Sequence, residues 1–375
     1  MLAQRLYFIF ELGWLYLMML FLQFAYPQAL VRLWAELATC AFIAVGGVLS
    51  WRPRYLRLWD LLGLLLSAVL LFQVGQAIPT EVVRVLAAFS MGFALPFVLS
   101  TAMASSTFND RGRTGALFGL SVSLVLALSS ILYVALREPR VYLLILLALK
   151  LLALASTVEA SPLKVGSSHN YIAVRGRGVL AALFLSWLAF LIAEGVTSYS
   201  IEVAYGGSFM AISRAIGMGL AAVFFPLFGY LMDRYGRRVL VLASYLIIGL
   251  GYALISAWEE ALMLYPVFEA SSWCVLTLFF VFVVWSDVAP LEARTRLYAL
   301  GSIPVFLGRF TMALLEHLGV VLKRHEFYPF ASLLMFLIAV MLFFSVPETL
   351  PSRVVERRRL AEYVERAKKI RKSYR

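Results

Sequence analysis

The chain has 375 residues, of which 62% are hydrophobic and only 14% are charged, with a formal net charge of +12 at pH 7. Its mean hydropathy of +0.88 lies far outside the usual range of soluble domains. This composition excludes a soluble protein and indicates one that crosses a membrane many times. Because the Lys and Arg residues are spread over loops and a tail, membrane orientation and anionic lipid explain the positive charge better than nucleic acid.

Apolar segments long enough to cross a membrane follow one another along the chain. A hydrocarbon core of about 30 Å takes about 20 apolar residues per helix, so the length predicts about twelve spanning helices with short loops. The first segment can span and has no small-residue cleavage site, which indicates a helix rather than a removed signal peptide. The predicted helices are 6–25, 30–50, 59–78, 82–104, 114–136, 141–159, 179–200, 208–232, 239–257, 261–285, 297–318 and 327–346.

Cations concentrate in alternate loops. They follow the even-numbered predicted helices, whereas the opposite loops hold fewer cations and several glutamates. By the positive-inside rule we expect a multi-pass protein of the cell membrane with both termini in the cytoplasm. The basic tail places apolar residues at helical spacing among its cations, so it either lies on an anionic leaflet or forms a solvated helix.

The longest polar stretch between apolar segments marks a division into two halves. An offset of about 182 positions brings Gly47 onto Gly229, which is the weak internal symmetry of a carrier built from two bundles. We predict an N-terminal six-helix bundle at 1–160, a cytoplasmic linker at 161–178, a C-terminal six-helix bundle at 179–347 and a basic cytoplasmic tail at 348–375.

Four charges stand in the short gap between the eighth and ninth predicted helices, within GYLMDRYGRRVLV at 229–241. A charge at the centre of a bilayer costs about 2.5–3.5 kcal/mol, so these side chains are expected at a membrane edge. The stretch resembles the signature loop of the major facilitator superfamily, G-x-L-x-D-R-x-G-R-R. The matching residues are Gly229, Leu231, Asp233, Arg234, Gly236, Arg237 and Arg238.

Further stretches carry the same resemblance. NDRGRTGALFG at 109–119 resembles the superfamily's loop between helices 4 and 5, and DVAPLEARTR at 287–296 resembles its counterpart between helices 10 and 11. Pro347, Glu348 and Thr349 resemble the end of helix 12 in the sugar-porter branch. The resemblance implies an all-α polytopic fold of twelve helices in two pseudo-symmetric bundles, and a secondary active transporter that works by alternating access.

The resemblance also implies a gate on the cytoplasmic side. In the superfamily the Asp of the signature loop holds this side shut against the opposite half, and its partner here would be the start of the helix that carries Arg111 and Arg113. A carboxylate at a helix N-terminus gains about 0.3–1 kcal/mol, and Arg113 adds an ion pair. We therefore expect Asp233 to latch the outward-open state to residues 111–114.

Two features depart from the superfamily's pattern. The first-half copy of the signature loop, at 47–59, keeps Gly47 but has Trp51 where the Asp belongs. The predicted first helix contains no Asp to face Arg84, although Arg84 opens the row of small residues typical of helix 4. These departures argue against symmetric gating, against a sugar substrate and against proton symport through a helix 1 Asp.

Ionisable residues inside the predicted helices are the candidates for the substrate and proton pathway, because a charge in a membrane must pair or line water. Lys150 and Arg309 lie deepest, and as paired cations they favour a small polar or anionic organic solute. Glu194 and Arg214 are positioned to pair, either beside a substrate or as a staple between two helices. The candidates are Glu11, Glu36, Arg84, Lys150, Glu194, Arg214, Glu269 and Arg309.

Proton coupling needs a carboxylate that takes up a proton on one side and releases it on the other. Glu11, Glu194 and Glu269 all qualify, and the sequence does not choose among them. Aromatic residues either stack on a ligand or form interfacial belts and packing. These aromatic residues are Trp14, Tyr16, Trp187, Tyr199, Tyr205, Trp273 and Trp285.

Other functional classes lack their sequence signatures. No G-x-x-x-x-G-K-[ST] loop occurs and the three histidines are scattered, so we expect neither an ATP-driven pump nor an enzyme, and no cofactor or metal site. Cys40 and Cys274 fall in apolar runs and are expected to be free thiols. We expect a monomer that binds a small-molecule substrate and the lipid bilayer. An amphiphile efflux carrier and a non-transporting scaffold or sensor are the alternatives.

Overall fold

The computed structural model describes most of the chain. Every regular element in the described part is helical. Most of the predicted linker 161–178 and most of the tail 348–375 lie outside the described residues, as does the core of the first-half loop copy at 47–59. The described residues are 2–25, 29–49, 56–73, 80–104, 106–107, 109–136, 139–159, 177–320, 324–350, Glu356, Leu360, Tyr363 and Val364.

The first half of the chain forms six helices, in agreement with the six predicted apolar segments. Each predicted helix is present, with ends that differ by a few residues because polar residues at the membrane edge continue the helical backbone. The helices are α1 (Leu2–Ala25), α2 (Ala29–Leu49), α3 (Leu56–Gln73), α4 (Thr80–Ala104), α5 (Arg111–Leu136) and α6 (Pro139–Glu159).

The second half also supplies six spans, but two of them are not simple helices. The helix α7 (Arg177–Tyr235) changes direction at Gly206, whose φ of 84° favours glycine, so it contributes two arms, Gly178–Gly206 and Ile212–Tyr235. The tenth span is built from four pieces, including a six-residue π-helical segment of the kind often found at functional sites. The remaining elements are α8 (Arg237–Ala257), η2 (Glu259–Leu264), α9 (Tyr265–Thr277), η3 (Leu278–Val283), α10 (Val284–Val288), α11 (Leu291–Leu318) and α12 (Arg324–Ser345).

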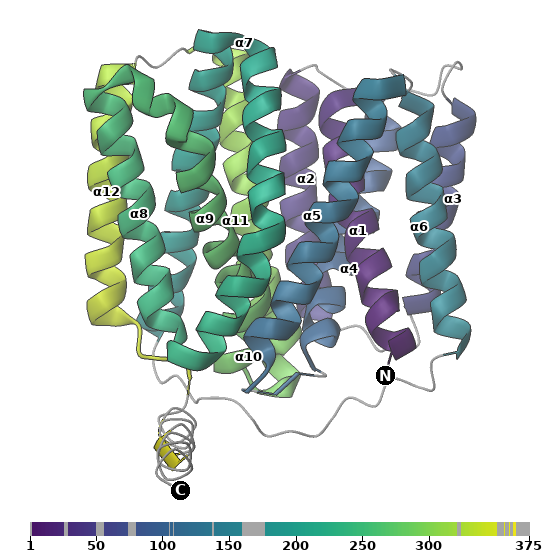
Figure 1. Ribbon diagram of the computed structural model, residues 1–375. Helices are drawn as coiled ribbons and strands as arrows, with labels where there is room; N and C mark the ends of the chain where they lie inside the picture. Colours follow the sequence, from purple (N-terminus) through teal and green to yellow (C-terminus); the bar gives the residue numbers. More distant parts are fainter. Residues whose placement is uncertain are drawn as a thin grey trace, which may run out of the picture.

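The helices gather into two groups that lie side by side, α1–α6 in one and α7–α12 in the other (Figure 1). The groups meet along two lines, where α2 contacts α11 and where α5 contacts the second arm of α7. Large apolar side chains such as Leu128 and Phe344 remain exposed on the outside, as expected for a surface that faces lipid. Within the described part of the chain, eight helices are both long and apolar enough to cross a membrane.

One end of the bundle collects the charged turns between helices. The start of α1 and the end of α12 lie at this end (Figure 1). It also contains residues 106–113, 233–237 and 287–294, and we call it the latch end; the opposite end is the far end. The sequence predicts that the latch end is cytoplasmic.

Glycines at equivalent places in the two halves set the contacts between the groups at the latch end. A Cβ atom on Gly229 would lie 2.7 Å from the carbonyl oxygen of Gly112, so only glycine allows α5 and the second arm of α7 to approach this closely. Gly47, its counterpart at the predicted offset, faces Arg296 and Ala299 of α11. The first-half copy of the loop therefore keeps the residue that close packing requires, although it lost the Asp.

A buried charge cluster joins three helices of the first group. Lys150 of α6 donates to both carboxylate oxygens of Glu11 on α1, at 2.5 and 2.6 Å, and its Nζ lies 3.4 Å from Asp60 on α3. The ammonium also lies 4.1 Å from the ring centroid of Trp14, and the Tyr7 hydroxyl donates to Asp60 at 3.3 Å. All three charged side chains are only 1% exposed.

This cluster corrects the predicted pairing of Lys150 with Arg309. The face of α6 that carries Lys150 points into its own helix group, towards α1 and α3, so its charge is balanced there rather than in the path between the groups. The sequence missed Asp60 because it lies second in the predicted helix 59–78, where a charge looks interfacial. In fact α3 begins at Leu56, and Asp60 is buried one turn inside it.

Replacing Lys150 with Met should destabilise the protein, because two buried carboxylates would lose their cation. Removing one partner of a buried ion pair costs about 3–5 kcal/mol. We expect a clear fall in the thermal unfolding midpoint of the purified protein in detergent. The triple variant Glu11→Gln/Asp60→Asn/Lys150→Met should recover much of the loss, and Arg140→Met, which removes an exposed cation from the same helix, should change little. Equal midpoints for Lys150→Met and Arg140→Met would contradict the assignment.

Candidate functional site

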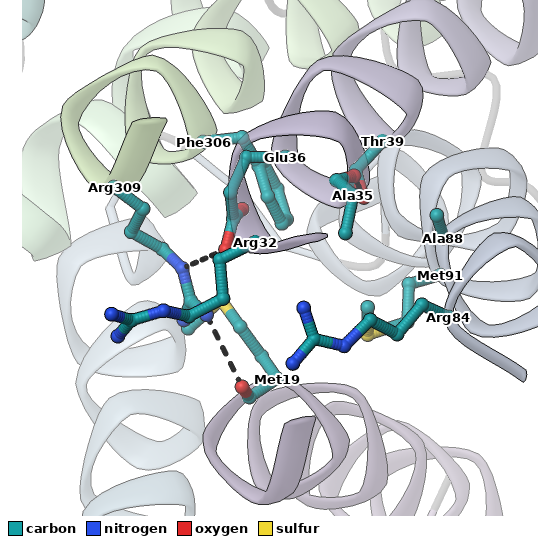
Figure 2. Close-up of a pocket in the computed structure, with 10 residues that line it drawn as sticks. All are labelled: Met19, Arg32, Ala35, Glu36, Thr39, Arg84, Ala88, Met91, Phe306 and Arg309. Atoms are coloured by element: carbon teal, nitrogen blue, oxygen red, sulfur yellow. Dashed lines mark hydrogen bonds and ion pairs between the residues drawn. The ribbon is translucent and has the colours of Figure 1, made fainter. Parts of the chain in front are cut away.

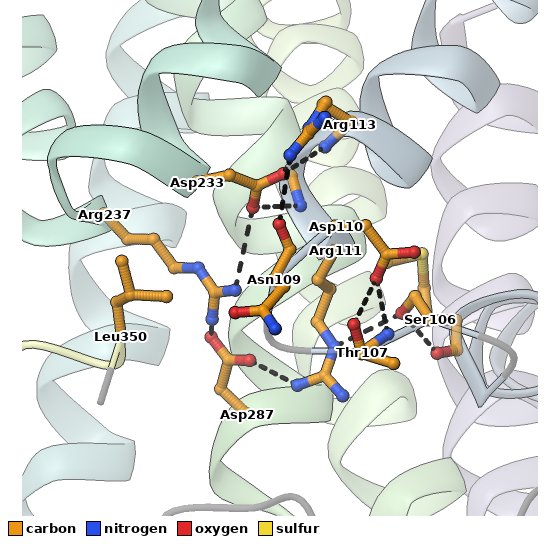
Figure 3. Close-up of polar contacts among 12 residues, drawn as sticks. Ser106, Thr107, Asn109, Asp110, Arg111, Arg113, Asp233, Arg237, Asp287 and Leu350 are labelled. Carbon is orange, nitrogen blue, oxygen red and sulfur yellow. Dashed lines mark hydrogen bonds and ion pairs between the residues drawn. The ribbon is translucent and has the colours of Figure 1, made fainter. Parts of the chain in front are cut away.

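The signature-loop Asp closes one line of contact between the two helix groups. Asp233 lies at the end of the second arm of α7 and accepts hydrogen bonds from the backbone N–H groups of Gly112, at 2.8 Å, and Arg113, at 3.0 Å (Figure 3). The first N–H groups of α5 have no partners inside their own helix, so a carboxylate there satisfies them. The side chain of Arg113 adds a contact at 3.5 Å. The predicted contact between Asp233 and 111–114 is therefore present.

A second acidic residue lies at the centre of the latch end. Asp287 of α10 is fully buried and pairs with Arg111 of α5 through one carboxylate oxygen and with Arg237 of α8 through the other (Figure 3). Arg237 also lies 4.0 Å from Asp233. Two aspartates and two arginines from four helices thus form one network that crosses between the groups. We call these four residues the latch network.

The sequence pointed to Asp287 only as part of the stretch 287–296, without a role. Its position two residues past the predicted helix 261–285 suggested a solvated loop. The helix instead continues through Val288 and carries Asp287 into the interior. The signal that could have found it is the reappearance of an acid-then-base pattern in both halves, at 110–113 and 287–296.

Other residues of the signature loop lie around this network. The carboxylate of Glu348, just after α12, accepts hydrogen bonds from the N–H groups of Arg237, at 3.0 Å, and Arg238, at 3.1 Å, and so caps α8. Gly236 adopts a φ of 109° in the turn beneath it. The guanidinium of Arg238 donates to the Phe343 carbonyl. The tripeptide 347–349 therefore ties the end of α12 to the signature loop.

The central path between the groups starts above the latch network. Gly119 of α5 packs closely on Phe225 of the second arm of α7, and residues of both helices beyond this point line a cavity. A cavity of about 340 Å³ fills the space between them. Its wall is mainly apolar and aromatic. The residues that line it include Tyr16, Trp187, Phe225, Glu269, Trp273 and Phe282.

On the opposite side of the path, α2 and α11 stay joined along their whole length. Arg309 donates to Glu36 at 2.9 Å, and nearer the far end Arg32 pairs with Glu316. The thiol of Cys40 contacts the Ile303 carbonyl at 3.9 Å. A vestibule of about 470 Å³ lies at the far end, lined by residues of α2, α7 and α11.

Three arginines line a pocket that shares Arg32, Glu36 and Arg309 with the vestibule. Arg84 enters from α4 and Arg309 from α11, on opposite sides of Glu36, while Arg32 extends from α2 towards the vestibule (Figure 2). Arg309 also donates to the Met19 carbonyl at 3.3 Å. Arg84 is only 2% exposed, although the sequence placed it near a helix end. The second cation that lines the same pocket as Arg309 is therefore Arg84, and it is not Lys150 as the sequence predicted.

Glu194 and Arg214 do not form the predicted pair. The carboxylate of Glu194 faces α8 and α9, where it accepts hydrogen bonds from Tyr265, at 2.8 Å, and Tyr252, at 3.1 Å. Arg214 lies on the other arm of α7, faces the vestibule and pairs with Glu202 at 3.7 Å. The bend at Gly206 separates the two residues onto different surfaces. Glu269, in contrast, lies on the wall of the central cavity.

No protein-family model matches the sequence, and no curated protein sequence matches it. Solved structures do match the three-dimensional arrangement. The proton:xylose symporter XylE, a major facilitator superfamily protein, superposes with a TM-score of 0.66 over 92% of this chain and 94% of its own, at 13% sequence identity. The chain has the major facilitator fold.

Two further structures agree with this major facilitator assignment. The human organic anion transporter MFSD10 matches with a TM-score of 0.71 at 13% identity, over 91% of this chain and 99% of its own. A double tryptophan mutant of XylE reaches 0.73 at 13% identity, over 95% and 97%. The twelve-helix all-α polytopic fold predicted from the signature loop is confirmed. Identities this low establish the major facilitator fold and leave the substrate to the residues of this chain.

Removing either aspartate of the latch network should open the latch end. With Cys40 and Cys274 replaced by Ala, we would place a reporter at Ala116→Cys, which is buried against Gly229. Asp287 accepts hydrogen bonds from two arginines and Asp233 from two backbone N–H groups, and a charge-assisted hydrogen bond contributes about 1.5–3 kcal/mol. We expect Asp233→Asn and Asp287→Asn to raise the rate of maleimide labelling by about tenfold or more.

The matched control for this labelling is Asp110→Asn, since Asp110 bonds to Thr107 within its own turn and not across the groups. Its labelling rate should equal that of the reporter protein. If both Asp233→Asn and Asp287→Asn also left the rate unchanged, the latch network would have no role in closing this end.

Proposed function

We propose that the protein is a secondary active transporter that moves a small organic solute across the cell membrane by alternating access. The observation that carries the proposal is a path between two helix groups that is sealed at the latch end and widens into a vestibule at the far end. A carrier must close one side while the other is open, and the latch network joins the groups at one end only. The solved structures with this fold are described as transporters.

The orientation follows from the charge of the loops. If the latch end is cytoplasmic, as the positive-inside rule predicts, this conformation faces outward. The two lines of contact then have different roles. The continuous contact of α2 with α11 acts as the hinge side, and the separated α5 and second arm of α7 form the side that opens and closes.

The lining of the path favours a solute with an apolar or aromatic body and an acidic group. The rings of Trp187 and Trp273 offer flat apolar surfaces in the central cavity. The neighbouring pocket presents Arg32, Arg84 and Arg309 with a single carboxylate, from Glu36. Guanidinium groups bind carboxylates and phosphates through paired hydrogen bonds. MFSD10, which shares the fold, is described as an organic anion transporter.

A cationic amphiphile is the second candidate. Glu269 supplies a carboxylate on a mainly apolar wall that also includes Arg214, and a carboxylate beside aromatic rings suits an amine attached to a ring system. The two candidates require opposite charges on the solute, so one panel of labelled compounds separates them. A sugar is the third class for that panel, because the structural neighbour XylE is a proton:xylose symporter.

The test is counterflow into proteoliposomes with labelled benzoate, xylose and tetraphenylphosphonium. We expect benzoate uptake, with Arg309→Gln and Arg84→Gln each raising the half-saturating concentration about tenfold or more, because each loses a charge-assisted hydrogen bond of about 1.5–3 kcal/mol. Arg140→Gln, which removes an exposed cation of α6, is the matched control and should leave uptake unchanged. Uptake of tetraphenylphosphonium alone would select the second candidate. Silence for all three compounds in folded protein would favour a scaffold or sensor.

A further inference from the structure

A third arginine is buried at the latch end without a counter-charge. Arg294 of α11 is only 3% exposed, and its Nε atom has no hydrogen-bond partner. The described residues give its guanidinium group no hydrogen bond and no ion pair, in contrast to Arg111 and Arg237, which share Asp287. A buried arginine without a balancing anion is very costly, so an anion beside Arg294 would stabilise the closed end.

The position of Arg294 follows from its neighbours on α11. Arg294 and Tyr298 are one turn apart and share a face of the helix, and the Tyr298 hydroxyl lies 2.8 Å from the Ser286 hydroxyl on α10. The residue after Arg294, Thr295, contacts Ser100 of α4 at 3.1 Å. Arg294 is therefore buried where α4, α10 and α11 meet, at the edge of the latch network.

The internal symmetry of the chain identifies the missing counter-charge. An offset of about 183 positions brings Arg111 onto Arg294 and Ala104 onto Asp287. Arg111 of the first half pairs with Asp287 of the second, so the symmetric partner of Arg294 would stand at position 104. That position is an alanine, one turn after Ser100 on the face of α4 that contacts α11. The chain has the arginine of this second pair but not its carboxylate.

We propose that a small monovalent anion, with chloride as the probe, binds beside Arg294 and completes the charge balance of the closed latch end. An anion of this size can take the place of the carboxylate group that Ala104 lacks, and the guanidinium group supplies the hydrogen bonds that bind it. The proposal concerns the closure of this end and does not depend on which solute the protein carries.

Binding of the anion favours one conformation over the other. In the closed conformation Arg294 is buried, so an anion there gains a desolvated, charge-assisted contact. When the helix groups separate at this end, water solvates the guanidinium group and the anion is released. Because the anion has a higher affinity for the closed conformation, its concentration shifts the equilibrium towards closure.

The anion is tested by labelling at Ala116→Cys in the background without Cys40 and Cys274. Maleimide labelling of the purified protein is compared in sodium chloride and in sodium gluconate at equal ionic strength, which holds general screening constant. Gluconate is far larger than a carboxylate group and serves as the reference anion. We expect a rate about tenfold lower in chloride, because a charge-assisted hydrogen bond forms only in the closed conformation. Equal rates in the two salts would overturn the proposal.

Two variants make the anion unnecessary by different routes. Ala104→Asp supplies the carboxylate within the chain, and Arg294→Gln removes the buried cation. Both variants should label slowly in either salt, at about the rate that the reporter protein shows in chloride. An effect of chloride on the maleimide reaction itself would persist in both. Chloride dependence retained in Arg294→Gln would overturn the proposal even if Ala104→Asp failed to fold.

A matched control and two further anions separate this site from other sources of negative charge. Arg296→Gln removes an exposed cation two residues along the same helix and should keep the full chloride dependence. Formate, a small carboxylate, should act as chloride does, whereas phosphatidylglycerol added in gluconate should not lower the rate. If the lipid lowered the rate and chloride did not, the counter-charge of Arg294 would come from the membrane and the small-anion site would be overturned.

Discussion

The buried carboxylate of Asp287 holds the latch end together. Arg111 and Arg237 come from opposite helix groups, and both side chains are fully removed from solvent. An arginine buried without a counter-charge is very costly, and Asp287 supplies a counter-charge to both arginines, with Asp233 4.0 Å from Arg237 as a second one. Asp233 adds a second bridge through the N-terminus of α5. Closure at this end is thus enforced by charge balance, and a change that separates the groups must provide water or new partners for all four charges.

The two lines of contact between the helix groups differ, and the difference gives the fold its direction. The contact of α2 with α11 is held at several depths by the ion pairs Glu36–Arg309 and Arg32–Glu316. The contact of α5 with the second arm of α7 is tight only near the latch end, where Gly112 and Gly229 meet. Beyond it the same two helices border the central cavity. The sequence agrees with this asymmetry. The first-half copy of the signature loop has Trp51 where the Asp belongs, so only the second half carries the Asp of the latch network.

Buried charge has a different role in each helix group. In the first group, the single cation Lys150 lies between two buried carboxylates, Glu11 and Asp60. In the second group, the buried carboxylate of Glu194 is held by the hydroxyl groups of Tyr252 and Tyr265 instead of a cation.

The sequence alone determined the number of spans, the two halves and the contact of Asp233 with the start of α5. The number of spans follows from apolar length, whereas the Asp233 contact was implied by the resemblance of its loop to the superfamily's signature and agrees with the affinity of a carboxylate for free N–H groups at a helix end. It also placed every candidate charge on the correct helix. Composition and spacing can establish the spans and the helix that carries each charge, because both depend on one segment at a time.

Only the tertiary structure decided which charges are partners. Lys150 and Arg309 were both predicted at mid-depth, yet they face different surfaces, because the rotation of each helix about its own axis decides whether a side chain faces the interior of its own group or the other group. Glu194 and Arg214 were close in depth and were separated by the bend at Gly206. The sequence suggested that Asp287 is solvated, but α10 places it in the interior between two arginines. Pairing depends on how helices from distant parts of the chain are rotated against one another, and no local pattern in the sequence records that rotation.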